Sequence, residues 1–126
     1  MPFLIDSDVL IDVSRGKDNA IEFVDALTEP FAISQVTALE LIVGARDKRD
    51  TAMIDAFLSL YSIVPLTESI GVLSFRLLKN YAKSHGLHVF GALIAATAIE
   101  TASTLITRNR RHYQMITSLR VQIPNY

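Results

Sequence analysis

The sequence predicts an α/β fold: a mostly parallel sheet of four to five strands, sandwiched by helices in a single domain. Short apolar runs alternate along the chain with longer stretches at helical spacing, which is the pattern of strands connected by crossover helices. No repeat, low-complexity tract or Pro/Gly-rich linker interrupts the 126 residues. Half of the residues are apolar, so residues 1–126 are expected to form one domain with its own core.

The N-terminal half is expected to alternate strands and helices. The first helix should end at Gly16, and the second should begin at Asp18 as N-cap. Pro30 leads into the second strand, and the spacing of Thr37 and Glu40 resembles a capping box in the helix that follows. The expected strands here are 2–5 and 31–34, and the expected helices are 9–16, 18–28, 36–46 and 50–60.

The C-terminal half is expected to hold a long amphipathic helix, capped by Thr67 and stopped by Gly86. The next helix is apolar nearly all round, so it should be central and buried. Leu58, Leu60 and Tyr61 fit either the core or a dimer face. The expected helices here are 68–84 and 90–102, and the expected strands are 62–66, 104–107 and 121–123.

Composition excludes several classes of protein. The chain has no cysteine, which rules out thiolate zinc sites and disulfide scaffolds and fits a reducing cytoplasm. No apolar run approaches the roughly 20 residues of a membrane span, and the N-terminus has no basic leader, so neither membrane insertion nor a signal peptide is expected. The net charge of −1 means that a polyanion must be met by a local patch.

Acidic and polar residues follow three of the expected strands. Asp6 follows the first, Glu40 lies in the helix after the second, and Thr107 and Asn109 follow the fourth. Because the carboxyl ends of parallel strands meet at one edge, these groups should converge there. Carboxylates are the ligands of Mg²⁺ and Mn²⁺, and such an ion activates water and stabilises the charge on a phosphodiester.

Each of these residues also has a purely structural interpretation. Asp6, Ser7 and Asp8 are all suitable helix caps, and Asp8 fits that role better than a ligand's. Asp12 is expected to face solvent. Glu40 fits a capping box and Asn109 a turn, and an arginine run is usually a solvated face.

Four segments together resemble the PIN-domain ribonucleases, most closely the VapC-type toxins of toxin–antitoxin operons. The resemblance covers almost the whole chain, and it implies a parallel sheet flanked by helices and an acidic Mg²⁺ or Mn²⁺ pocket. It also implies cleavage of RNA such as tRNA, a homodimer, and a cognate VapB-type antitoxin. The segments are IDSDVLID (5–12), SQVTALEL (34–41), GLHVFGALIAATAIE (86–100) and LITRNRRHY (105–113).

The resemblance assigns roles to individual residues. Asp6 and Glu40 match the first two acids and are the implied metal ligands, with Ser7, Asp8 and Thr107 in support. By the same resemblance, Asn109 falls in the catalytic motif after the fourth strand. Arg108, Arg110 and Arg111 lie where RNA phosphates arrive in the family.

One position departs from the family pattern. Gly91 stands where the family carries a third acid, before Ala92, Leu93 and Ile94. We therefore expect impaired catalysis, whether the glycine is natural, engineered or selected during cloning. The alternative is an inactive PIN-like module that binds antitoxin or RNA without cutting.

A phosphatase of the haloacid-dehalogenase type is a third hypothesis. Asp6 and Asp8 imitate the Asp-x-Asp opening of that superfamily. Leu10 stands where Thr or Val is expected, and no later lysine and paired-acid motif is visible, so this hypothesis is disfavoured.

Overall fold

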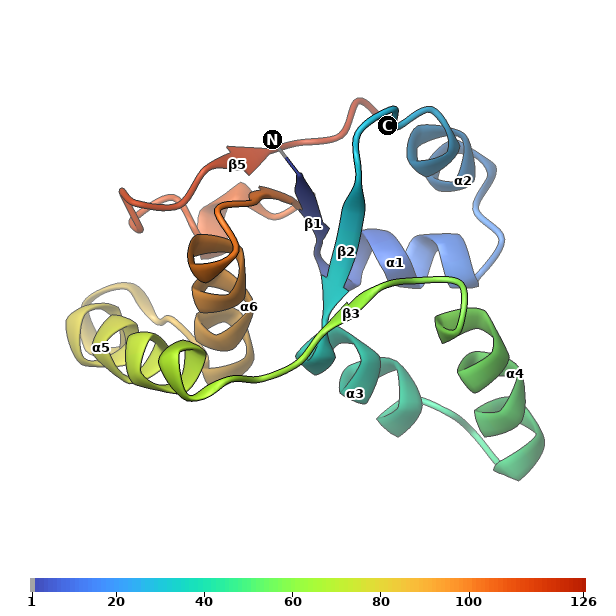
Figure 1. Cartoon of the computed structure of the whole chain (residues 1–126), viewed down its shortest axis with the longest axis horizontal. Coiled ribbons are helices and arrows are strands. Elements are labelled where there is room, and N and C mark those ends of the chain that lie inside the picture. Colours follow the sequence, from blue (N-terminus) through green and yellow to red (C-terminus); the bar gives the residue numbers. More distant parts are fainter. Residues whose placement is uncertain (1) are drawn as a thin grey trace.

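The computed structural model describes residues 2–126 and shows a five-stranded sheet with helices on both faces (Figure 1). The strand order is β3-β2-β1-β4-β5, and every neighbouring pair is parallel, which confirms the expected fold class. The strands are β1 (Phe3–Ile5), β2 (Phe31–Ser34), β3 (Ile63–Val64), β4 (Thr104–Ile106) and β5 (Val121–Gln122).

The helices lie where the sequence predicted them, with shifted ends. They are α1 (Ser7–Ser14), α2 (Asp18–Asp25), α3 (Gln35–Val43), α4 (Lys48–Leu58), α5 (Glu68–His85) and α6 (Val89–Glu100), followed by the short 3₁₀ helix η1 (Arg110–His112). In residues 2–126 no helix combines the length and the apolar character needed to cross a membrane.

The helix caps confirm two of the sequence predictions and correct two others. The Thr67 cap and the left-handed Gly86 at the two ends of α5 are confirmed. The Asp18 prediction is wrong, since Lys17 is the N-cap of α2 and Asp18 is already helical. The Thr37–Glu40 capping box is also wrong, because Ser34 caps α3 by accepting from the backbone N–H of Val36 at 3.1 Å.

Alternate residues of the central strands point to opposite faces of the sheet, as the strand period of two requires. Leu4 and Leu105 pack with α5 and α6 on one face. Ile5 and Ile106 pack with α1, α2 and α4 on the other face. The sheet is therefore buried on both sides, as expected for a parallel sheet covered by helices.

Leu58, Leu60 and Tyr61, which the sequence assigned to either the core or a dimer face, differ in their burial. Leu58 is buried, and Tyr61 packs its ring against Phe31 and Phe57. Leu60 is 77% exposed and lies on the surface. Of these three, only Leu60 is therefore free to contribute to a dimer face.

The chain order of the strands defines a crevice. From β1 the chain runs outward through β2 and β3, and then returns to the other side of β1 as β4. The backbone N–H of Asp6 donates to the carbonyl of Ile106 at 2.9 Å, which brings the ends of β1 and β4 together. Open parallel sheets bind ligands at this kind of switch point, beyond the carboxyl ends of the strands.

Candidate metal centre and nuclease pocket

A cavity of about 420 Å³ lies at the carboxyl ends of β1 and β4. It collects residues that are remote in sequence, including those predicted to form the site. Its polar lining comes from the N-terminus of α1, from α3, from the loop before α6 and from the segment after β4. The predicted residues among its lining are Asp6, Ser7, Asp8, Glu40, Gly91, Asn109 and Arg111.

Asp6 is held in place by hydrogen bonds to both carboxylate oxygens. Oδ1 accepts from the backbone N–H of Ser7 at 2.8 Å, which makes Asp6 the N-cap of α1. Oδ2 accepts from the hydroxyl of Thr107 at 2.8 Å and from that of Tyr113 at 3.1 Å. Burial raises the pKa of Asp6, and the three donors oppose the increase. The hydrogen bonds therefore fix the direction of the carboxylate, while burial disfavours its charged form.

Ser7 connects the two predicted acids. Its hydroxyl donates to Oε1 of Glu40 at 2.7 Å and lies 2.9 Å from the hydroxyl of Thr37. Because Ser7 Oγ has one proton, which it gives to Glu40, Thr37 must be the donor in the second bond. The Thr37–Ser7–Glu40 chain ties α3 to the start of α1. This contact, rather than a capping box, is the function of the Thr37–Glu40 spacing.

Asp8 faces the turn after β4. Its Oδ1 accepts from the backbone N–H of Val9 at 2.7 Å, and its Oδ2 accepts from the backbone N–H of Arg108 at 3.0 Å. Burial, and then the charge of Asp6, raise the pKa of Asp8 to about 6. The expected role of Asp8 as a helix cap is therefore replaced by a cross-link between α1 and the segment after β4.

Comparison with known proteins identifies the family. The PIN-domain profile matches residues 3–116. Ribonuclease VapC19 of Mycobacterium tuberculosis is 35% identical over 120 residues, which span 92% of this chain and 95% of that protein. The chain belongs to the PIN-domain family and, within it, to the VapC ribonucleases.

Other relatives agree. Ribonuclease VapC1 of Methanocaldococcus jannaschii is 30% identical over 122 residues, or 95% of this chain and 85% of that protein. A toxin–antitoxin complex from Klebsiella pneumoniae contains a chain that matches with a TM-score of 0.78 and 29% identity, covering 93% and 94% of the two chains. VapBC2 from Rickettsia felis matches with a TM-score of 0.83 at 20% identity over 98% of each chain, which supports the fold.

Gly91 lies in the first turn of α6 and lines the cavity at the carboxyl ends of β1 and β4, called the PIN pocket from here on. A Cβ atom at residue 91 would lie 3.5 Å from Leu87 Cδ1 and 3.9 Å from Tyr113 Cε1, which are ordinary van der Waals contacts. Its φ is not positive, unlike those of Gly16 and Gly86. Neither packing nor backbone conformation therefore requires a glycine there.

The carboxylates of the PIN pocket fit a hydrated ion. Within residues 2–126, no group of three or more His, Asp and Glu side chains is arranged to hold a metal. Asp6, the N-cap of α1, and Glu40 of α3 still line one cavity. Mg²⁺ is commonly bound through only one or two carboxylates and keeps several waters, so this donor set suits it.

The three arginines expected to meet RNA phosphates, Arg108, Arg110 and Arg111, lie apart in space. Among the described residues, Arg111 is the arginine that lines the cavity. The guanidinium of Arg108 instead donates to Asp12 Oδ2 at 3.1 Å, and Arg110 is exposed in η1. Asp12, expected to face solvent, is thus engaged by a cation.

Sequence reasoning missed several lining residues. Tyr113 is 3% exposed and donates to Asp6, and His88 and His112 line the cavity with their ring centroids 6.4 Å apart. Asn109 Nδ2 lies 3.2 Å from His112 Nε2. Tyr113 and His112 belong to the LITRNRRHY segment. Because the polar residues of this segment continue past Asn109, they were the feature of the sequence that could have indicated further lining residues.

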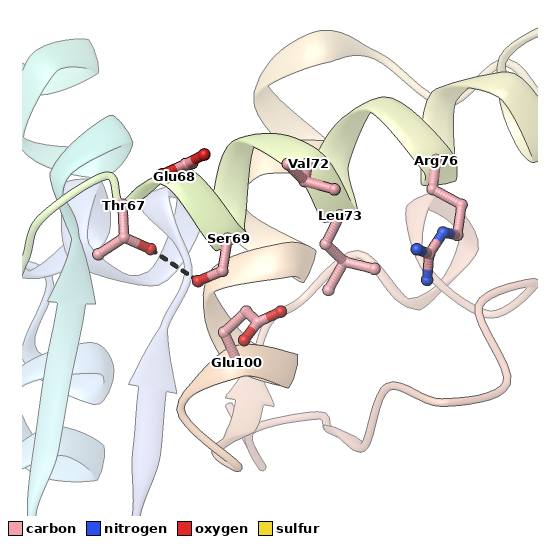
Figure 2. A pocket seen from close by; sticks show the side chains of 7 residues that line it. All are labelled: Thr67, Glu68, Ser69, Val72, Leu73, Arg76 and Glu100. Carbon is pink, nitrogen blue, oxygen red and sulfur yellow. Dashed lines mark hydrogen bonds between the residues drawn. The ribbon is translucent and has the colours of Figure 1, made fainter.

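A second hollow lies between α5 and the end of α6 (Figure 2). Figure 2 shows Glu100 and Arg76 pointing toward it. Glu100 ends α6, whereas Gly91 lies in its first turn, so about 14 Å of helix separates this hollow from the acidic pocket. It receives none of the strand-end residues predicted to form the site. Its lining is Thr67, Glu68, Ser69, Val72, Leu73, Arg76 and Glu100.

Proposed function

We propose that this chain is the toxin of a VapBC-type toxin–antitoxin pair, a Mg²⁺- or Mn²⁺-dependent endoribonuclease weakened by Gly91. The observation that carries the proposal is the Ser7 hydroxyl, which bonds Glu40 beside the buried Asp6 in one cavity. Two acids from separate elements approach each other in this cavity. Such an arrangement is costly unless a cation joins it.

The chain's own residues would prepare the site for hydrolysis. Asp6 and Glu40 would hold the ion, which when bound supplies an activated water and balances the charge developing on the phosphodiester. Thr107 and Tyr113 orient Asp6 through their hydrogen bonds. Arg111, on the cavity wall, is the group best placed to receive an RNA phosphate.

Asn109 is the neutral member of the proposed catalytic set. It lines the same cavity, and its backbone N–H donates to the Thr107 hydroxyl at 3.1 Å. Asn109 therefore lies in the same turn as Thr107, which donates a hydrogen bond to Asp6. Arg108 and Arg110 remain proposed RNA contacts at the edge of the site, and the RNA class we propose is a structured RNA such as tRNA.

The proposed partners are a VapB-type antitoxin and a second copy of the chain. The Klebsiella pneumoniae relative is a toxin–antitoxin complex. The first two helices and the rim of the acidic pocket are the proposed antitoxin surface. Exposed apolar side chains on α3 and α4, such as Leu39, Val43 and Met53, are available for a homodimer or antitoxin contact.

An inactive binding module is the second candidate function, and Gly91 is the observation that favours it. With the third acid absent, the pocket has one anionic ligand fewer than the family pattern. A module of this kind would bind RNA or antitoxin without requiring a divalent ion.

Restoring the acid tests the proposal. Gly91→Asp is expected to raise Mn²⁺-dependent RNA cleavage about 100-fold or more, since a metal ligand contributes several kcal/mol to transition-state stabilisation. Gly71→Asp is the matched control, because residue 71 is exposed in α5 and has open space for a Cβ atom. It should leave cleavage unchanged.

Two results would contradict this account. Equal cleavage by the unmodified and Gly91→Asp chains would show that the third acid is irrelevant. RNA binding that does not depend on Mn²⁺, with no cleavage by either chain, would favour the binding module.

A further inference from the structure

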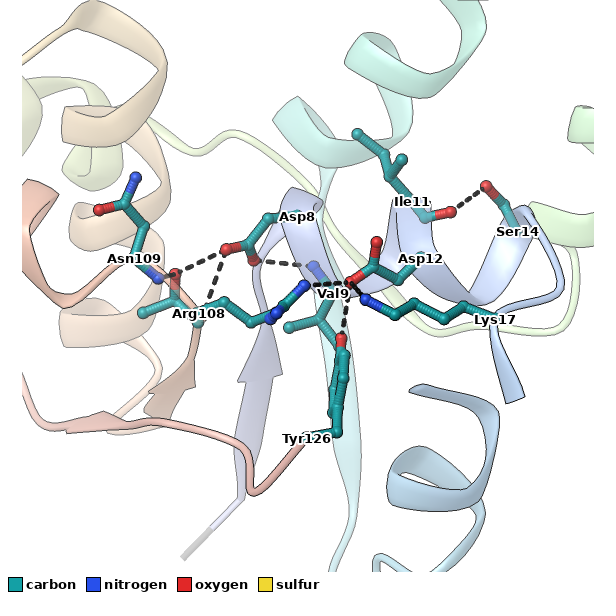
Figure 3. Close-up of polar contacts among 10 residues, drawn as sticks. Asp8, Val9, Ile11, Asp12, Ser14, Lys17, Arg108, Asn109 and Tyr126 are labelled. Atoms are coloured by element: carbon teal, nitrogen blue, oxygen red, sulfur yellow. Dashed lines mark hydrogen bonds and ion pairs between the residues drawn. The ribbon is translucent and has the colours of Figure 1, made fainter. Parts of the chain in front are cut away.

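Three polar groups, two of them from distant parts of the chain, converge on one carboxylate oxygen. Oδ2 of Asp12 accepts from Arg108 Nη1 at 3.1 Å and from the Tyr126 hydroxyl at 3.0 Å. Lys17 Nζ lies 4.0 Å from the same oxygen (Figure 3). Asp12 belongs to α1, Arg108 follows β4 and Tyr126 follows β5. These four residues, here called the Tyr126 clamp, join α1 to the segments that follow β4 and β5.

The aromatic ring of Tyr126 adds a second set of contacts. Arg108 Cζ lies 4.8 Å from the ring centroid and Lys17 Nζ lies 5.3 Å from it, both within cation–π range. The ring of Phe23 packs against it at 6.1 Å between centroids. Burial and the bond to Asp12 raise the pKa of Tyr126, so its hydroxyl remains a donor.

Arg108 connects the Tyr126 clamp to the pocket. Asp8 and Asp12 are four residues apart and therefore share a face of α1. The backbone N–H of Arg108 donates to Asp8 at 3.0 Å, while its guanidinium donates to Asp12. Arg108 thus lies along this face and is held at both ends, as Figure 3 shows.

The neighbours of Arg108 are the residues that matter to the site. Thr107 donates to Oδ2 of Asp6 at 2.8 Å, and the Asn109 backbone N–H donates to the Thr107 hydroxyl at 3.1 Å. Because these residues are consecutive, a displacement of Arg108 moves both the Asp6 partner and Asn109. The position of the 107–109 turn is therefore set from outside the cavity.

We propose that Tyr126 is a positioning residue: its contacts with Arg108 and Asp12 hold the 107–109 turn in register with Asp6 and Asp8. The effect on catalysis rests on the proposed nuclease function, whereas the effect on the turn does not. In this arrangement Arg108 acts chiefly through its fixed position, and Arg111 is left to meet the substrate. Tyr126 itself is not among the residues that line the acidic cavity.

Amide hydrogen exchange measured by NMR on the full chain tests the positioning. Tyr126→Ala is expected to speed exchange at the Arg108 and Asn109 amides about 10-fold, since the first donates across to Asp8 of α1 and the second to Thr107 within the turn. Tyr126→Phe keeps the ring and loses only the hydroxyl, so it should have a smaller effect. Tyr61→Ala and Tyr61→Phe are the matched controls, because Tyr61 packs in the core near α4.

A kinetic measurement separates positioning from general loss of stability. In the Gly91→Asp chain, Tyr126→Ala should lower kcat about 5-fold while KM changes less than about 2-fold, because misplaced groups affect the transition state. The Tyr61 variants should leave both constants unchanged at a temperature where every variant is folded. If Tyr126→Ala does not fold, Asp12→Asn and Tyr126→Phe carry the same measurements.

Unchanged exchange at Arg108 and Asn109 in Tyr126→Ala would overturn the proposal. So would faster exchange accompanied by an unchanged kcat. If the Gly91→Asp chain cleaves no RNA at all, the proposed nuclease function fails, and the exchange rates still decide whether Tyr126 holds the turn.

Discussion

The hydroxyl of Ser7 donates a 2.7 Å hydrogen bond to Glu40, joining two residues 33 positions apart in sequence. Ser7 follows the buried Asp6, whose Oδ1 accepts from the Ser7 backbone N–H. One residue therefore fixes the orientation of both acids. The consequences for stability, pH dependence and metal binding can each be measured.

Ser7→Ala should release Glu40 and leave the buried Thr37 hydroxyl without its partner. An unsatisfied buried polar group costs about 1–3 kcal/mol, so the free energy of unfolding should fall by roughly that amount. Urea denaturation measures the change. Ser14→Ala is the control, because the Ser14 hydroxyl bonds only the Ile11 carbonyl at the exposed end of α1. Equal losses in the two variants would contradict the proposed bridge.

Tyr113→Phe should destabilise the pocket without changing its shape. The variant removes one of the three donors to the buried Asp6 carboxylate. A hydrogen bond to a charged group contributes about 1.5–3 kcal/mol, so unfolding at pH 7 should become easier by up to that amount. At low pH, where Asp6 is protonated, the difference should shrink. Tyr81→Phe provides the comparison, because Tyr81 is a half-buried tyrosine of α5 that does not line the cavity.

Asp8 should make the metal-free chain more stable in mild acid. The pKa of its carboxyl rises from an ordinary value of 3.8 to about 6 on folding, mainly through burial. A raised pKa contributes stability that is present below pH 3.8 and lost as the pH rises through about 6, a difference of up to about 3 kcal/mol. Asp6 acts in the same direction, because its pKa is also raised.

Urea unfolding between pH 4 and pH 7 in the presence of a chelator checks this dependence. Asp8→Asn should flatten the curve, since an amide does not titrate. The opposite result would be a free energy of unfolding that rises with pH over this interval in the unmodified chain and has the same slope in Asp8→Asn. That result would show that Asp8 is not buried as described.

Mn²⁺ should stabilise the folded chain, and more strongly after Gly91→Asp. A ligand that binds only the folded state raises stability by RT ln(1 + [L]/Kd), so the shift in Tm reports affinity. The unmodified chain should show a small shift and the Gly91→Asp chain a larger one at the same Mn²⁺ concentration. Asp6→Asn should abolish both shifts. Shifts that persist in Asp6→Asn would place the ion elsewhere.

The sequence predicted the fold class and the convergence at the sheet edge because both follow from periodicity. Apolar runs identified the strands, and parallel strands bring the residues that follow them to one edge. Asp6, Glu40 and Gly91 accordingly line one cavity. The pattern alone did not single out Gly91, and the family resemblance supplied the expectation that this glycine stands at an acidic position.

The errors share a physical cause. Thr37 and Glu40 have the spacing of a capping box, but that spacing equally places both side chains toward Ser7 on a different helix. Asp12 looked like a surface residue because its partner Tyr126 is 114 positions away. Local rules evaluate neighbours along the chain, so they miss contacts that form only when the strands assemble.

The position of an ion tests the central claim most directly. Crystals of the unmodified and Gly91→Asp chains soaked in Mn²⁺ should give an anomalous peak in the cavity. The peak should lie about 2.0–2.3 Å from a carboxylate oxygen of Asp6. It should lie at the same distance from a carboxylate oxygen of Glu40, or from a water oxygen that is hydrogen-bonded to Glu40. The peak should be stronger in Gly91→Asp. An empty cavity in both crystals, or manganese bound only at sites away from Asp6, would contradict the account.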